Sequence, residues 1–205
     1  MRKNKLLVLL SCCSMVLLLS GCAKQEIKNA DPAGTAIICF GDSLTLGYGA
    51  GPGEDYPAIL AKLAGLPVIN AGVDADTTFL ALNRLKSDVL NKGARLVIVE
   101  FCGNDFIKKV PFEATISNLR QIIRYAQRQG ALVALVDISA GFFLLEYRVA
   151  YRKLAREEGA IFIPAILNGI LTNPSMKSDF LHPNANGYKI VAERIYQAIR
   201  PYLKK

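Results

Sequence analysis

Short apolar runs alternate with longer helix-like stretches along most of this chain, and the alternation restricts the fold more than any other feature. The runs are residues 35–41, 66–70, 95–102, 131–138 and 160–163, and the helix-like stretches are 55–64, 77–92, 111–129, 144–158 and 184–202. Strands that alternate with helices form βαβ units, and near-continuous Val, Ile and Leu runs are typical of parallel strands buried on both faces. We therefore expect one α/β domain with a three-layer, doubly wound, parallel five-stranded sheet of flavodoxin-like order 2-1-3-4-5.

Polar side chains follow the ends of these predicted strands. Beyond the first, second, third and fifth strands come Ser43, Gly72, Gly103-Asn104-Asp105, and Asp179 with His182. Because the C-terminal ends of parallel strands meet at one edge of a sheet, these groups are expected to converge there. Such convergence is what a catalytic site requires.

His182 is the single histidine of the chain. A serine at neutral pH needs a neighbouring base to become a useful nucleophile, and the pKa of imidazole suits that role. Asp179, three residues upstream, can hold the ring in one tautomer, and Pro183 disfavours a helical conformation at His182. The residues alone also allow a structural interpretation, in which Ser43 caps a helix, Asp179 forms a turn and His182 lies in a surface loop.

The first residues have the pattern of an export signal. Residues 2–5 are mostly basic, and the apolar core at 6–19 is too short for a comfortable membrane span. The core ends in Leu-Ser-Gly at 19–21, followed by Cys22, which resembles the lipobox of bacterial lipoproteins. In that class the cysteine is lipidated and becomes the first residue of the mature chain. The alternative is an ordinary secretory signal with an incidental cysteine.

This interpretation divides the chain into a signal peptide (1–21), a lipidated tether (22–34) and one domain (35–205). We expect an exported lipoprotein of the bacterial cell envelope, anchored to a membrane through Cys22 and facing the periplasm or the cell surface. The chain carries 25 Lys and Arg residues against 17 Asp and Glu residues, a balance that suits a position near anionic lipid. No basic stripe interleaved with aromatic residues occurs, so nucleic acid is not an expected partner.

Cys39 and Cys102 are the two cysteines left once the signal and Cys22 are set aside. Each lies in an apolar run, which favours two buried thiols over a disulfide, although an exported compartment permits one. The Cys and His spacing matches no metal site, and we expect no metal and no cofactor. A nucleotide or flavin binder of the same fold is disfavoured, because the first strand is followed by neither a Walker lysine nor a G-x-G-x-x-G motif.

Four short motifs, in a fixed order, carry a resemblance to a known family. They are Gly41-Asp42-Ser43-Leu44, the Gly72 of Asn70-Ala71-Gly72, Gly103-Asn104-Asp105, and Asp179-x-x-His182. The set is similar to the four sequence blocks of the SGNH (GDSL) hydrolase superfamily and covers essentially the whole mature chain. Residues 47–50, 76–78 and 182–187 further resemble the bacterial arylesterase, lysophospholipase and thioesterase I subgroup.

The resemblance implies a role for each matching residue. Ser43 is the nucleophile, His182 the general base and then acid, and Asp179 the residue that orients His182. The oxyanion hole is formed by the backbone N–H groups of Ser43 and Gly72 and the side-chain amide of Asn104. The implied reaction is hydrolysis of aryl esters, lysophospholipids or acyl thioesters through an acyl-enzyme. A cell-envelope carbohydrate O-deacetylase with the same triad and a non-catalytic envelope lipoprotein are the alternatives.

Two departures from the subgroup affect the expected substrate range. Cys102 stands where the subgroup more often has glycine, and residues 137–145 look shorter than the corresponding loop. Apolar residues near the predicted active edge are candidates to line a groove for an acyl chain. These candidates are Phe106, Ile107, Phe142, Phe143, Leu144 and Leu145.

Overall fold

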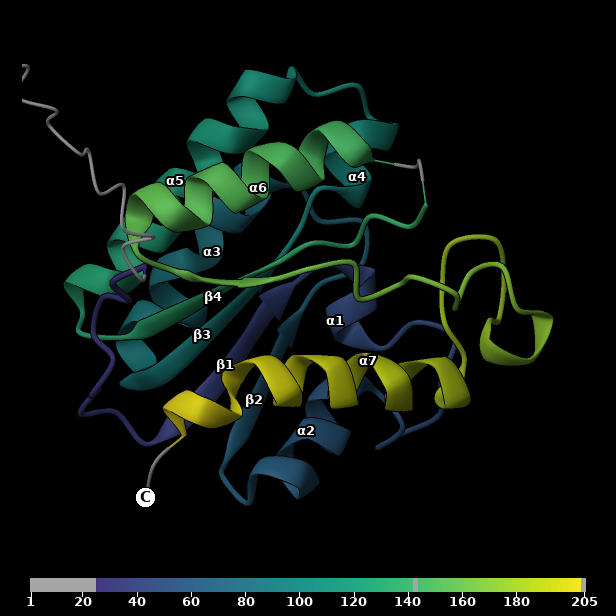
Figure 1. The fold of residues 1–205 in the computed structure, drawn as a ribbon, viewed down its shortest axis with the longest axis horizontal. Helices are drawn as coiled ribbons and strands as arrows, with labels where there is room; N and C mark the ends of the chain where they lie inside the picture. Colours follow the sequence, from purple (N-terminus) through teal and green to yellow (C-terminus); the bar gives the residue numbers. More distant parts are fainter. Residues whose placement is uncertain (1–24, 142–143, 204–205) are drawn as a thin grey trace, which may run out of the picture.

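The computed structural model describes residues 25–141 and 144–203 and is built around a five-stranded sheet (Figure 1). The strands are β1 (Ala36–Gly41), β2 (Val68–Gly72), β3 (Ala94–Glu100), β4 (Leu132–Val136) and β5 (Ile161–Ile163). Every neighbouring pair is parallel and the order is β2-β1-β3-β4-β5. The predicted doubly wound sheet is confirmed, whereas the predicted export signal and Cys22 lie outside the described residues.

Helices cover both faces of the sheet (Figure 1). One face carries α2 (Tyr56–Ala64) and α7 (Ala185–Ile199), and the other carries α3 (Thr78–Asp88), α5 (Phe112–Arg128) and α6 (Leu145–Glu158). Shorter elements are α1 (Ser43–Leu46), α4 (Gly103–Ile107), η1 (Leu90–Lys92), η2 (Pro174–Met176) and η3 (Arg200–Tyr202). The five predicted helices occur within a few residues of their expected bounds. The sequence did not predict α1 and α4, because four or five residues are too few to show a helical period.

The central strands form the interior. Every residue of β1 and β4 is buried, whereas most of the edge strand β2 is only half-buried. β2 ends at Gly72 rather than at the predicted Asn70, because its ladder with β1 continues until Gly41 pairs with Gly72. Backbone pairing, not the apolar run, therefore sets the end of this strand.

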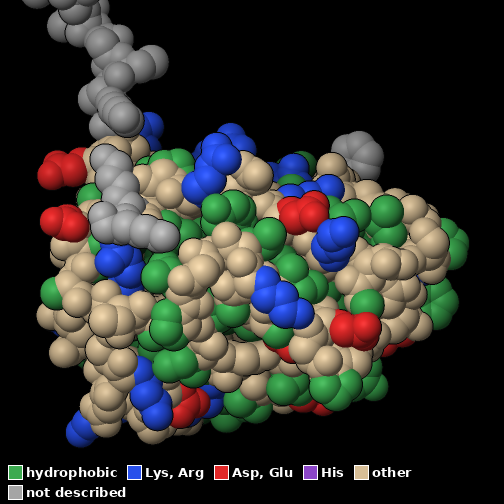
Figure 2. All heavy atoms as spheres, turned by 90° about the horizontal axis from the view of Figure 1, so that it is seen from below, with side chains coloured by type: hydrophobic (Ala, Val, Ile, Leu, Met, Phe, Trp, Pro, Cys, Tyr) green, Lys and Arg blue, Asp and Glu red, His purple; other side chains and the backbone are tan. Residues whose placement is uncertain are grey.

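The two cysteines of the domain lie in its interior. Cys39 and Cys102 are both free and buried, which confirms the prediction of buried thiols. Within residues 25–141 and 144–203, none of the helices combines the length and apolar character needed to cross a bilayer. On the face seen in Figure 2, Lys and Arg side chains are scattered among acidic and hydrophobic ones.

Candidate active site

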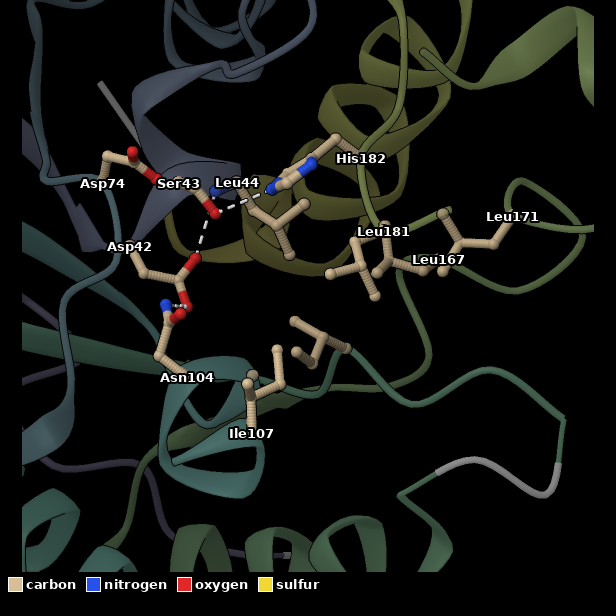
Figure 3. Close-up of a pocket in the computed structure, with 12 residues that line it drawn as sticks. Asp42, Ser43, Leu44, Asp74, Asn104, Ile107, Leu167, Leu171, Leu181 and His182 are labelled. Atoms are coloured by element: carbon tan, nitrogen blue, oxygen red, sulfur yellow. Dashed lines mark hydrogen bonds between the residues drawn. The ribbon is translucent and has the colours of Figure 1, made fainter. Parts of the chain in front are cut away.

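Ser43 is the first residue of α1, directly after β1 (Figure 3). Asp42, not Ser43, is the N-cap of this short helix, because its Oδ1 accepts a hydrogen bond from the backbone N–H of Leu44 at 3.1 Å. The capping role that the sequence alone allowed for Ser43 is thus filled by its neighbour. Ser43 Oγ instead lies 3.0 Å from Nε2 of His182.

Asp179 both folds the loop before α7 and holds the imidazole. Its Oδ2 lies 2.8 Å from His182 Nδ1, and its Oδ1 accepts the backbone N–H groups of Leu181 and His182 at 2.7 and 2.8 Å. Burial alone raises the pKa of Asp179, but the hydrogen bonds from His182 and from these backbone groups outweigh it and lower the pKa. The ionised carboxylate favours the tautomer with the proton on Nδ1, so Nε2 is free to accept the proton of Ser43.

The loop that carries His182 is held at both ends. An antiparallel bridge pairs Lys177 with Pro183, which closes the loop at its base. A Cβ atom on Gly187 would lie 2.2 Å from the carbonyl oxygen of Met176, so glycine is required where α7 begins beside the preceding segment. These backbone contacts keep His182 in position even though the loop lies at the surface.

Asn104 brings a side-chain amide to the same edge of the sheet from α4. Its Nδ2 donates a hydrogen bond to Oδ2 of Asp42 at 3.1 Å. An amide nitrogen carries two hydrogens, so the second N–H of Asn104 remains available to a ligand. Asn104 therefore has the donor that the sequence predicted for an oxyanion hole.

Gly72 occupies the end of β2, where the sheet touches α1. A Cβ atom on Gly72 would lie 2.1 Å from the backbone nitrogen of Leu46, so no other residue allows this contact without a shift. The backbone N–H of Gly72 donates to Oδ1 of Asn70 at 2.9 Å. The structure therefore places this predicted oxyanion donor close to α1 but already engaged by a neighbouring side chain.

Two buried carboxyl groups lie behind the serine. Burial raises the pKa of Asp42 to about 6, although the hydrogen bonds from Leu44 and Asn104 lower it. Burial, and then the nearby charge of Asp42, raise the pKa of Glu100 well above its ordinary value. Glu100 Oε2 accepts a hydrogen bond from Thr45 Oγ1 at 2.8 Å, which ties α1 to the end of β3.

A cavity of about 130 Å³ opens beside Ser43 and His182 (Figure 3). Its apolar lining consists of Leu44, Ile107, Ile138, Leu167, Leu171 and Leu181. Among the described residues of the predicted groove, Ile107 lines this cavity and Phe106, Leu144 and Leu145 do not. Leu144 is part of the buried core, Leu145 is exposed at the start of α6, and Phe142 and Phe143 lie outside the described residues.

Comparison with known proteins identifies the family. The sequence profile of the GDSL-like lipase/acylhydrolase family matches residues 39–190, a segment that contains Ser43, Asn104, Asp179 and His182. The chain belongs to this family. The match confirms the resemblance on which the residue roles were predicted.

Relatives of this GDSL-family chain align with most of its length. Esterase TesA of Pseudomonas aeruginosa is 25% identical over an alignment of 198 residues that covers 91% of this chain and 98% of that protein. Thioesterase 1/protease 1/lysophospholipase L1 of Escherichia coli K12 is 27% identical over an alignment of 177 residues that covers 82% of this chain and 85% of that protein. The crystal structure of AlinE4, an SGNH-hydrolase family esterase, superposes with a TM-score of 0.64 at 30% identity, covering 84% of this chain and 98% of that chain.

Two further side chains, Tyr48 and Arg84, support the site of this GDSL-family protein. The ring of Tyr48 lies 4.5 Å from the imidazole of His182, centroid to centroid. Arg84 donates to Oδ2 of Asp76 at 2.8 Å and to the carbonyl oxygen of Gly41 at 3.0 Å, so α3 is tied to the end of β1. The sequence around Arg84 does not show whether an arginine within a helical stretch ties two elements together or points into solvent.

Proposed function

We propose that the protein is a serine carboxylic ester hydrolase that cleaves esters and thioesters through an acyl-enzyme on Ser43. The observation that carries the proposal is the continuous hydrogen-bond chain from Ser43 through His182 to Asp179, with lengths of 3.0 and 2.8 Å. A hydroxyl, a base and an orienting carboxylate in this order are the signature of an activated serine nucleophile. Family membership and relatives named esterase, thioesterase and lysophospholipase support the same reaction class.

In the proposed reaction Ser43 Oγ attacks the carbonyl carbon while Nε2 of His182 takes the hydroxyl proton. The protonated imidazole then gives this proton to the leaving alcohol or thiol, and the acyl-enzyme forms. Water, deprotonated by Nε2, attacks the acyl carbon. The imidazolium then returns this proton to Ser43 Oγ as the bond between Oγ and the acyl carbon breaks, and the carboxylic acid leaves. Asp179 stabilises the imidazolium in both half-reactions. The oxyanion is bound by the backbone N–H of Ser43, the second N–H of Asn104, and the N–H of Gly72 once its present bond is released.

The cavity supports an acyl group as the part of the substrate that enters the protein. Its lining is largely apolar and its volume is about 130 Å³, below the roughly 300–1,000 Å³ of sites that enclose drug-sized ligands. We therefore infer a preference for short and medium acyl chains, with the alcohol or thiol portion at the mouth. An acetyl group would leave much of the lining uncovered, which disfavours the carbohydrate O-deacetylase alternative.

Turnover and covalent labelling test this proposal together. The wild-type protein is expected to react with a fluorophosphonate and to hydrolyse p-nitrophenyl butyrate and octanoate faster than palmitate. Ser43→Ala removes the label and His182→Ala removes nearly all turnover while leaving the fold intact, whereas Ser117→Ala, an exposed serine on α5, changes neither. A Ser43→Ala protein that still turns over, or a wild type without labelling or turnover, refutes the proposal and favours a non-catalytic envelope protein.

We also propose that Cys22 is lipidated and that the protein is an exported, membrane-anchored lipoprotein. The support is the basic start, short apolar core and lipobox-like end of the first 22 residues. Incorporation of labelled palmitate into the full chain, lost in Cys22→Ala, tests this. Incorporation that persists in Cys22→Ala contradicts it.

A further inference from the structure

The segment that leads from the proposed anchor to β1 is held against the domain from Gln25 onward. The side-chain amide of Gln25 donates to the carbonyl oxygens of Ala155 and Ala160 at 3.0 and 2.9 Å. The backbone N–H of Lys28 donates to the carbonyl oxygen of Gly159 at 2.9 Å. All three acceptors belong to the end of α6 and the start of β5.

Asn29 makes the corresponding contacts at the end of α5. Its Nδ2 donates to the carbonyl oxygens of Gln127 and Ala131 at 2.8 and 2.9 Å. The carbonyl oxygens of Ala155 and Gln127 already accept the backbone N–H groups of Ala160 and Gly130, so the two side-chain amides add a second donor at each helix end. We call residues 25–29 the N-terminal clamp.

The N-terminal clamp lies at the edge of the sheet opposite the candidate active site. Helices α5 and α6 end where β4 and β5 begin, whereas Ser43 follows the C-terminal end of β1 (Figure 1). β3 has seven residues, so at about 3.3 Å per residue the two edges are roughly 20 Å apart. Two residues, Ala23 and Lys24, lie between Cys22 and Gln25, so the three steps from Cys22 to Gln25 span at most about 11 Å.

Exposed basic side chains gather at the edge that carries the clamp, because each long helix ends there. They are Lys28, Lys62, Lys86, Lys92, Arg124, Arg128, Arg156 and Arg200. The acidic side chains at this edge are Glu26, Asp31, Asp88, Glu157 and Glu158. Asp88 pairs with Arg84, Glu157 pairs with Arg120, and Glu158 pairs with Arg120, Arg124 and Lys28, so Lys28 and Arg124 are the members of the basic group that already have acidic partners here. Basic residues interact favourably with the helix dipole at the C-terminus of any helix. Here they also attract this edge of the domain to an anionic surface.

The opposite edge carries acidic groups around the cavity. Of the aspartates that follow strand ends there, Asp74 and Asp179 are exposed, whereas Asp42, Asp76 and Asp105 are buried and Asp76 pairs with Arg84. Lys108 and Lys109, after α4, are basic residues at this edge, as are Arg148 near the start of α6 and Lys177 in the loop before α7. At physiological salt, charges more than about 8 Å from a surface are largely screened from it. The basic edge beside the anchor is therefore the one that meets the lipid headgroups.

We propose that the clamp and the basic edge hold the anchored protein with the N-terminal edge of its sheet on an anionic bilayer and its active site facing away. The inference rests on the proposed lipid anchor. The enzyme then takes its acyl esters from the aqueous phase or from a facing surface, not from the bilayer that holds it. The exposed apolar residues of the cavity lining, Ile107 and Leu181, meet substrate rather than this bilayer.

Distance measurements on the lipidated full chain test the orientation. A fluorophore is attached to Lys92→Cys, at the edge that carries the clamp, or to Lys109→Cys, at the active edge, and the native thiols of Cys39 and Cys102 are buried. The protein is reconstituted in phosphatidylglycerol-containing vesicles with a headgroup-linked quencher. Because the edges are roughly 20 Å apart, we expect quenching at position 92 to be at least about twofold stronger. Equal quenching, or stronger quenching at position 109, overturns the proposal.

A second pair of variants tests the clamp itself. The double variant Gln25→Ala, Asn29→Ala frees the segment, so the difference in quenching between positions 92 and 109 should fall by at least half. The control double variant Gln121→Ala, Asn83→Ala, with both residues exposed on helices, should preserve this difference. An unchanged difference in the clamp variant overturns the role of the clamp, and a wild-type chain that lacks lipid on Cys22 overturns the whole inference. Turnover of dissolved p-nitrophenyl butyrate in the same samples reports the hydrolase proposal separately.

Discussion

The Nδ2 atom of Asn104 lies 3.1 Å from Oδ2 of Asp42, so the residue before the serine holds the amide expected to meet the oxyanion. The other oxygen of this carboxylate accepts the backbone N–H of Leu44 at 3.1 Å. An ionised carboxylate has no donor, so it pairs only with the NH₂ side of the amide and fixes which way Asn104 faces. Asp42 is thus a positioning residue rather than one that touches substrate.

We expect Asp42→Asn to lower kcat by roughly 10–100-fold with little change in KM, since loss of a whole oxyanion donor typically costs about 10²–10³. Asparagine has one oxygen where two accepting oxygens are needed, so the N–H of Leu44 or the amide of Asn104 then faces another N–H. Steady-state kinetics with p-nitrophenyl butyrate measure the effect. Asp31→Asn, exposed and remote, is the control, and wild-type kcat in Asp42→Asn would remove the positioning role.

The titration of Asp42 should appear in the pH dependence of folding stability. Burial holds the pKa of folded Asp42 at about 6, above the ordinary 3.8. Between about pH 4 and pH 6 the folded state therefore binds more protons than the unfolded state, and stability falls as the pH rises. Because Asp42→Asn cannot titrate, we expect it to gain up to about 3 kcal/mol relative to wild type across this window. Urea unfolding of both proteins at about pH 4 and pH 6 measures the difference in their free energies of unfolding. A difference that is the same at both pH values contradicts the raised pKa of Asp42.

Asp179→Asn and Asp179→Ala separate the two tasks of this carboxylate. Asparagine keeps an oxygen for the backbone N–H groups of Leu181 and His182 but gives Nδ1 an uncharged partner, so kcat should fall by roughly 10²–10⁴ with little change in Tm. Alanine removes the turn as well and should also lower Tm. Kinetics and calorimetry on both variants provide the readouts. Equal Tm values would exclude the turn role, and near-wild-type kcat in Asp179→Asn would exclude the orienting role.

The sequence could predict the parts of the molecule whose residues carry strong local patterns. The buried strands β1, β3 and β4 are continuous apolar runs, so their existence and parallel order follow from hydrophobicity and connection rules. Ser43 and His182 lie 139 positions apart. Their proximity could be predicted for two reasons. Parallel strands place their C-terminal ends at one edge of the sheet, and both residues match family motifs.

Other features depend on tertiary contacts that leave no local pattern. The cavity wall at Ile138, Leu167 and Leu171 comes from loops after β4 and β5, and loop positions are set by packing rather than by period. The choice of Asp42 over Ser43 as the N-cap was equally hidden, because both residue types cap helices well. The hydrogen bond between Gly72 and Asn70 depends on a side-chain rotamer that no spacing rule gives.

Cys102 allows a prediction about backbone strain beside the oxyanion hole. Its φ is 122° and its ψ is −21°, a region that non-glycine residues occupy at a cost of about 1–3 kcal/mol. Cys102→Gly removes this strain, whereas Cys102→Ala keeps it and loses the same buried sulfur. Glycine loses more conformational entropy on folding, about 0.5–1 kcal/mol relative to alanine, so we expect the Gly variant to be more stable than the Ala variant by about 1 kcal/mol. Chemical denaturation measures the free energy of unfolding of both variants. An Ala variant at least as stable as the Gly variant would mean that the backbone at Cys102, which leads to Asn104, is not strained.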